Sequence, residues 1–348
     1  MRPLFSPSMK IDLAIVGQGA VSPAGLGIDA LLAREPVPSQ VACVGQPDKT
    51  WPVLRVDFKN PAFLRWQKES RLRRASPISF FIVEAAEQAL ANLSASERSE
   101  TGLIVALSAG CLAYSRRFFE GIVTEGQRSA SPALFPETVF NSPVSHVASV
   151  LGLNGAAYAL AGDETAWIVG LKTASVWLRQ NRVKQVLVLG AEEFDPIVLD
   201  AYKSALWLIR RNSADDFLPS EGAAGVLVRQ SREGDSILIA TAQDGLVYRS
   251  KKEASIASRR LLQNIDPKIP YYPSAQRNWF RSLERECSKG LAVIPDSDRP
   301  YLGEAFTASS AWHTLRALHC LTTLTPRILL PVWGLNHQLG SLELEMRS

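Results

Sequence analysis

The chain has 348 residues, of which 46% are hydrophobic and 21% are charged, and its net charge at pH 7 is +4. This composition is typical of a soluble globular protein and argues against disorder. The charge is too small to indicate a nucleic-acid partner, and no apolar run approaches the roughly 18–20 residues of a membrane helix. The opening residues also lack the apolar core of a signal peptide. We therefore expect no nucleic-acid or membrane partner and a cytoplasmic location.

Short apolar strands alternate with helical patterns along the first part of the chain. A strand is expected at 12–19, a helix at 77–93, a strand at 101–110 and a helix at 145–153. The run KQVLVLGAEE at 184–193 is apolar throughout, as in a strand covered on both faces. Further strands are expected at 157–161, 222–230, 236–245, 326–334 and 341–346. This alternation predicts an α/β fold of layered sheets and helices.

Two carboxylates, Asp163 and Glu164, precede an apolar helix that should run to about residue 180. The helix has almost no polar face, so we expect it to be buried between sheets. An acid in the first turn of a helix accepts hydrogen bonds from unpaired backbone N–H groups and interacts favourably with the helix dipole. We interpret the pair chiefly as a helix cap, and a catalytic role is the alternative.

Several familiar motifs are excluded. GQGAVS at 17–22 begins like a dinucleotide fingerprint, but Ser22 replaces the third glycine and Pro23 follows it. PSEGAAG at 219–225 lacks the Lys-Ser/Thr of a P-loop. The cysteines form no CxxC pair and the histidines no HExxH pair, so we expect no metal site and no cofactor.

A basic stretch, RWQKESRLRR, spans residues 65–74 just before a helical pattern. It is either a solvated face or a docking patch for an acidic partner, and the sequence leaves both possibilities open.

Several stretches, in this order, resemble the β-ketoacyl synthases of the thiolase superfamily. The resemblance is carried by AIVGQGAVSPAGLG at 14–27, by the region 134–166, by VLVLGAEE at 186–193, by DDFLPSEGAAGVLV at 215–228 and by YLGEAFTASSAW at 301–312. It implies a thiolase-like α/β fold of two related βαβαβαββ halves, stacked in five layers (αβαβα). The halves are expected at 1–232 and 233–348, the second being shortened.

In that family a cysteine at the start of the buried helix carries the acyl group, and two histidines assist it. Aligned on this pattern, Glu164 stands at the nucleophile position and Glu304 at the position of the second histidine. The other histidine has no counterpart in 231–300, so the resemblance implies that no catalytic residue is intact. Cys111 follows a strand and mimics a nucleophile turn, but no histidine accompanies it, and we interpret it as a buried thiol. We expect Glu164 and Glu304 to lie close together, which would raise the pKa of one of them.

The loss of the nucleophile with retention of the scaffold glycines resembles the chain length factors of the family. Those scaffold glycines are Gly190, Gly222, Gly225 and Gly303. The resemblance implies a non-catalytic subunit that pairs with a catalytically intact ketosynthase, or with itself, and works with an acyl carrier protein. Type II fatty acid, polyketide and aryl-polyene biosynthesis are the candidate pathways.

The resemblance also names candidate binding residues. Phe140, Asn141 and Val144 are candidates for the acyl tunnel or the dimer interface, with ordinary packing as the alternative. Arg71, Arg73 and Arg74 are candidates for docking the carrier. Two other functions remain open: an enzyme with altered thioester chemistry that uses Glu164 and Glu304 as a decarboxylase or hydrolase, and a stand-alone acyl-binding adaptor.

Overall fold

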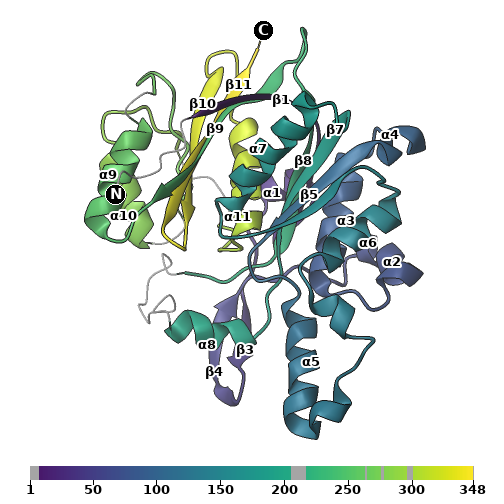
Figure 1. Cartoon of the computed structure of the whole chain (residues 1–348). Helices are drawn as coiled ribbons and strands as arrows, with labels where there is room; N and C mark the ends of the chain where they lie inside the picture. The colour runs from purple at the N-terminus through teal and green to yellow at the C-terminus, as the bar shows by residue number, and fades with distance from the viewer. Residues whose placement is uncertain (1–7, 205–216, 263–264, 276–277, 296–300, 348) are drawn as a thin grey trace.

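Nine strands form one mixed sheet in the computed structural model of the chain, which describes residues 8–204, 217–262, 265–275, 278–295 and 301–347 (Figure 1). The strand order is β10-β11-β9-β1-β8-β7-β5-β6, and the short β2 pairs with β1. The strands are β1 (Met9–Ser22), β2 (Gly25–Leu26), β5 (Thr101–Leu107), β6 (Ala157–Ala161), β7 (Gln185–Glu192), β8 (Gly222–Gln230), β9 (Ile237–Val247), β10 (Arg327–Gly334) and β11 (Gln338–Met346). A separate hairpin consists of β3 (Ser39–Cys43) and β4 (Gln46–Val53).

The helices cover both faces of this sheet. They are α1 (Ile28–Ala33), α2 (Pro61–Gln67), α3 (Pro77–Ala89), α4 (Ala95–Ser99), α5 (Leu112–Glu125), α6 (Ser142–Leu151), α7 (Ala166–Arg179), α8 (Ile197–Ser204), α9 (Lys251–Leu262), α10 (Asn278–Cys287) and α11 (Thr307–Leu318). Short 3₁₀ helices lie at η1 (Ser70–Leu72), η2 (Gln127–Ser129) and η3 (Phe135–Thr138). None of the described helices is long and apolar enough to cross a membrane.

Strand β1 joins the strands of the two expected halves. Its first residues pair with β9, as in Met9 with Ala242, and its later residues pair with β8, as in Val21 with Ala223. The strands β9, β11 and β10 therefore continue the sheet of β1, β8, β7, β5 and β6 instead of forming a separate one. The sequence predicted the individual strands but not this continuity.

The layers alternate as predicted. α3 and α6 pack on one face of β1, β8, β7 and β5, whereas α7 and α11 pack on the other face, against β9, β10 and β11 as well. α9 packs on the outer side of β9 and β11, and α10 packs on α9. This αβαβα order confirms the predicted fold class, and within the described residues the second part of the chain contributes only β9, β10 and β11 to the sheet.

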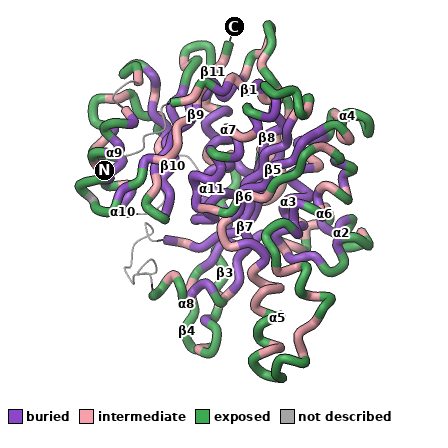
Figure 2. Tube along the Cα trace, viewed as in Figure 1, coloured by how far each residue is buried: buried purple, intermediate pink, exposed green. Residues whose placement is uncertain are grey.

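α7 and α11 form the buried centre of the molecule (Figure 2). α11 is rich in alanine, serine and threonine, so its backbone can approach β7 closely. A Cβ atom at Gly190 of β7 would lie 2.2 Å from the carbonyl oxygen of Thr307, which explains the glycine at that position. α7 is less enclosed than predicted, because Val169 and Val176 are 37% and 39% exposed.

Candidate functional site

The turn between β6 and α7 places Asp163 and Glu164 inside the molecule. Asp163 is 2% exposed and Glu164 is 3% exposed. The N–H groups of the first turn of α7 are already bonded to backbone carbonyls, including those of Asp163 and Glu164. The side chain of Asp163 does accept from the N–H of Thr165 at the start of α7, so the predicted cap is confirmed for Asp163, whereas the side chain of Glu164 bonds to no N–H of this helix.

The two carboxylates also hold the turn between β10 and β11. Glu164 Oε2 accepts from the N–H of Leu335 at 2.8 Å, and Asp163 Oδ2 accepts from the N–H of Asn336 at 3.2 Å. Asp163 Oδ1 accepts from the N–H and hydroxyl of Thr165 at 3.0 and 2.7 Å. The acids thus connect the start of α7 to a hairpin that lies far away in the sequence.

The side chain of Glu164 accepts fewer hydrogen bonds than that of Asp163. Its Oε1 atom is buried and has no hydrogen-bond partner among the described residues. Burial raises the pKa of Glu164 well above its ordinary value of 4.5, and the nearby charges of Glu304 and Asp163 raise it further. Burial and the neighbouring acids therefore favour the protonated form of Glu164.

Glu304 lies just before α11 in a tightly held segment. Its N–H donates to the carbonyl of Leu218 at 2.8 Å, and its Oε1 accepts from the N–H of Phe306 at 2.8 Å. Gly303, with φ of 71°, has no room for a side chain, since a Cβ atom would lie 2.6 Å from the carbonyl oxygen of Leu218. The backbone therefore fixes the 5% exposed carboxyl of Glu304 in place.

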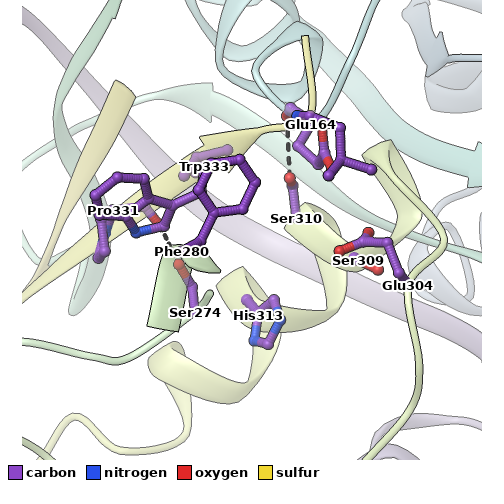
Figure 3. A pocket seen from close by; sticks show the side chains of 11 residues that line it. Glu164, Ser274, Phe280, Glu304, Ser309, Ser310, His313, Pro331 and Trp333 are labelled. Carbon is purple, nitrogen blue, oxygen red and sulfur yellow. Dashed lines mark hydrogen bonds between the residues drawn. The ribbon is translucent and has the colours of Figure 1, made fainter. Parts of the chain in front are cut away.

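The structure brings Glu164 and Glu304 to the same cavity (Figure 3). The cavity measures ≈20 Å³, which is about the space that a single water molecule needs. Its other lining residues are Ser274, Phe280, Ser309, Ser310, His313, Pro331, Val332, Trp333 and Leu335. It is polar on the side of α11 and aromatic where Phe280 stacks on Trp333. In this form it is far smaller than an acyl chain.

Sequence reasoning missed the contribution of α11 to this cavity. Ser309, Ser310 and His313 line it together, and the His313 ring packs edge-on against Tyr272 with centroids 6.1 Å apart. Ser310 Oγ also donates to the carbonyl of Glu164 at 3.0 Å. The available signal was the spacing of three and four residues, which places side chains on one face of a helix.

The other candidate residues lie away from this cavity. Phe140 is 41% exposed and packs against Gly110, and Asn141 is exposed just before α6. Val144 is 4% exposed and belongs to the core formed with α3, so it does not reach the surface of this chain as an interface residue would.

The arginines proposed for carrier docking surround η1. Arg71, Arg73 and Arg74 are all exposed, and Arg71 donates to the carbonyl of Ser149 at 2.5 Å, which ties η1 to α6. Among the described residues, the side chains of Arg73 and Arg74 form no ion pair or hydrogen bond. Their charges therefore leave a basic surface next to α3.

Cys111 precedes α5 and is 2% exposed. Burial raises the pKa of its thiol, and the charges of Glu193, Glu137 and Glu192 raise it further. A thiol of this kind is a poor nucleophile. Among the described residues no group of three or more His, Cys, Asp or Glu side chains is arranged to hold a metal ion.

A family model for the β-ketoacyl synthase N-terminal domain matches residues 42–233, more than half of the chain. The chain belongs to the β-ketoacyl synthase family. No curated protein matches it in sequence.

Solved structures of β-ketoacyl synthases share the fold at low sequence identity. The ishigamide ketosynthase/chain length factor has a TM-score of 0.78 at 17% identity, covering 97% of this chain and 100% of that one. A type II polyketide synthase acyl-carrier protein in complex with its ketosynthase bound to the hexaketide has a TM-score of 0.76 at 14% identity, covering 97% and 100%. A β-ketoacyl synthase from Burkholderia phymatum STM815 has a TM-score of 0.75 at 13% identity, covering 98% and 100%. These matches establish the thiolase-like fold.

Proposed function

We propose that this chain is a chain-length-factor-like subunit without condensing activity of its own. It pairs with a catalytically intact ketosynthase of type II fatty acid, polyketide or aryl-polyene biosynthesis and shapes the acyl tunnel of the pair. The observation that carries the proposal is the buried Glu164 at the start of α7, opposite Glu304 in a cavity of ≈20 Å³. An acyl group on a carboxylate would be a hydrolysable anhydride, so Glu164 cannot replace a cysteine as an acyl carrier.

The edge strand β6 supports a partner of the same fold. β6 is the last strand of the sheet, and Tyr158 on it is 55% exposed (Figure 2). α7 packs against β6 and carries two exposed valines, Val169 and Val176. An unpaired edge flanked by apolar side chains favours pairing with another strand.

The basic surface at η1 supports a carrier protein as the third component. Arg73 and Arg74 are exposed on the chain's surface, and a phosphopantetheine-bearing carrier would meet them with acidic side chains. Replacing both arginines with glutamate should weaken carrier binding at least about tenfold without changing the assembly of the two synthase-like subunits.

The decisive experiment co-expresses this chain with a ketosynthase from the same genomic neighbourhood that retains its cysteine and histidines. We expect the two to co-purify, and we expect mass spectrometry of this chain to find no acyl adduct on any cysteine. Replacing Phe140 by Ala should lengthen the products if this side chain limits the tunnel. Self-association without any ketosynthase partner would favour the stand-alone adaptor, and an acyl adduct on this chain would contradict the proposal.

A second function, altered thioester chemistry, is favoured by one observation. Because burial and the neighbouring acids favour the protonated form of Glu164, its carboxyl in that form can donate a hydrogen bond to a developing oxyanion instead of repelling it. In malonyl-thioester decarboxylation the C–C bond to the carboxylate breaks, CO₂ leaves, and the electron pair forms an enolate that Glu164 would stabilise and protonate. This requires the Leu335 turn to open, because the cavity is too small for a thioester.

The two functions differ in a direct assay. The purified subunit, alone and with its partner, is incubated with malonyl-carrier thioester, and acetyl-carrier thioester and free acid are measured. Product formation that is lost in Glu164→Gln would establish the enzyme, whereas equal background with wild type and Glu164→Gln supports the non-catalytic subunit.

A further inference from the structure

Three side chains at the junction of α7 and α11 bring polar atoms to the cavity. Glu164 comes from the turn before α7, and Ser309 and Ser310 come from the first turn of α11 (Figure 3). They are 3%, 3% and 4% exposed, in that order. Bulk solvent therefore does not reach these groups, and they must find their hydrogen-bond partners inside the molecule.

The carboxyl of Glu164 has one oxygen left over. Its Oε2 accepts from the N–H of Leu335 at 2.8 Å, whereas its Oε1 is buried and has no hydrogen-bond partner among the described residues. A buried oxygen without a partner is costly, and the cost is larger when the carboxyl is ionised. Oε1 requires a donor when the carboxyl is ionised and an acceptor when Oε1 carries the proton. A ligand that serves both states must be able to donate and to accept.

The two serines have complementary capacity left. Ser309 Oγ accepts from the N–H of Ala305 at 2.8 Å, and no described interaction uses its hydroxyl hydrogen. Ser310 Oγ donates to the carbonyl of Glu164 at 3.0 Å, and no described donor uses its lone pairs. One unused donor, one unused acceptor and one carboxyl oxygen therefore belong to residues that line the same cavity.

The size of the cavity matches one water molecule. The cavity measures ≈20 Å³, whereas a buried water needs at least about 10–15 Å³. A buried water makes about three hydrogen bonds, which is the number that the unused groups of Glu164, Ser309 and Ser310 can supply. Phe280 and Trp333 form an apolar wall on the other side, so the polar contacts gather at the junction of α7 and α11.

We propose that the cavity binds one structural water, which accepts from Ser309, donates to Ser310 and bonds to Oε1 of Glu164. The water donates to Oε1 when the carboxyl is ionised and accepts from it when Oε1 is protonated. Both arrangements use no more than the two hydrogens and two lone pairs of water. A metal cation or an ammonium ion accepts no hydrogen bond and would serve the ionised carboxyl alone. The water links α7 to α11 and, through the N–H of Leu335, to the turn between β10 and β11.

This water belongs to the folded chain by itself and does not rest on the proposed function. It has one consequence that does rest on the second function, thioester decarboxylation. In that reaction the thioester oxygen would take the place of the water next to Glu164, and the displaced hydrogen bonds would have to be remade by the substrate.

Crystal structures of the full chain at high resolution, grown at pH 5.5 and pH 8, test the site. We expect one fully occupied peak about 2.6–3.2 Å from Glu164 Oε1 and from the Oγ atoms of Ser309 and Ser310, at both pH values. An empty cavity, or a direct bond from Ser309 to Glu164 that closes it, would overturn the proposal. Contacts shorter than about 2.5 Å would indicate a metal cation and would overturn it as well.

Two substitutions at Glu164 separate a water from a cation. Glu164→Gln keeps a hydrogen-bonding group of the same shape, so the water should stay, whereas a cation held by the carboxylate would be lost. Glu164→Leu removes the polar group and should empty the cavity. Ser79→Ala is the control, because Ser79 Oγ is also buried without a described partner but does not line this cavity, so the peak should remain. Loss of the peak in Glu164→Gln would contradict a water, and the wild-type structures decide the question if Glu164→Leu does not fold.

The site is also tested in solution, where magnetic relaxation dispersion counts the long-lived waters inside a protein. We expect the same count in the wild type and in Glu164→Gln, and one long-lived water fewer in Glu164→Leu. An equal count in all three proteins would contradict the proposal. None of these measurements uses a ketosynthase, so a failure to assemble with one would sink the proposed function and leave the water site standing.

Discussion

Glu164 shows how one buried side chain couples the site to the stability of the whole chain. Its folded-state pKa lies well above 4.5, so the folded protein keeps a proton that the unfolded chain releases above that pH. The contribution of this proton to the free energy of unfolding is present in full below about pH 4.5 and is lost as pH rises, by up to about 1.4 kcal/mol per pH unit.

Glu164→Gln abolishes this titration. The free energy of unfolding of the variant minus that of the wild type should therefore be larger at pH 8 than at pH 5, as measured by urea unfolding at both values. Glu87→Gln, in a surface ion pair with Arg98, serves as the control and should follow the wild-type pH dependence. If Glu164→Gln also follows it, Glu164 does not retain its proton in the folded protein.

At the scale of elements, the contact of β7 with α11 has no spare room. A Cβ atom at Gly190 would lie 2.2 Å from the backbone oxygen of Thr307, and backbone cannot move aside as a flexible side chain can. Gly190→Ala should lower the free energy of unfolding by about 1–3 kcal/mol, measured by denaturant titration. Gly121→Ala in α5 is the matched control, since its nearest atom would be Ser129 Oγ at 3.8 Å. That control should be neutral or stabilising by up to about 1 kcal/mol. Equal stability of the two variants would mean that α11 can shift away from the sheet at little cost.

The elements also show which parts of the structure the sequence could predict. β7, β8 and α7 were predicted to within two residues because each is a continuous apolar run with clear ends. α11 was not predicted, although Ala308, Ala311, Trp312, Leu315 and Leu318 recur at helical spacing, because its first half consists of small and polar residues that resemble a turn. The bond from the N–H of Leu335 to Glu164 joins residues 171 positions apart, so no local pattern could reveal it. The proximity of Glu164 to Glu304 was expected from the family pattern, whereas His313 entered the cavity through a helix that had not been predicted.

At the scale of the whole molecule, the edge strand β6 is the surface at which we expect the proposed partner to bind. Tyr158→Lys places a charge at the second residue of this edge strand, and charges of this kind prevent strand pairing in natural sheets. We expect the variant to remain folded but to lose dimer formation, measured by analytical ultracentrifugation with and without a ketosynthase. Leu324→Lys, at a 94% exposed position in the loop before β10, is the control and should assemble normally. Normal assembly of Tyr158→Lys would exclude β6 as the contact.

The position of β11 bears on how the chain is made. β11 lies between β9 and β10 in the sheet, although both precede it in the sequence (Figure 1). During synthesis β9 and β10 therefore emerge as strands that cannot pair with each other in the native way, with apolar side chains and unpaired backbone groups exposed until β11 arrives between them. The turn that contacts Asp163 and Glu164 forms in the same event, because it connects β10 to β11. Insertion of β11 thus completes both the described sheet and the cavity, and until then the unpaired edges of β9 and β10 favour mispairing.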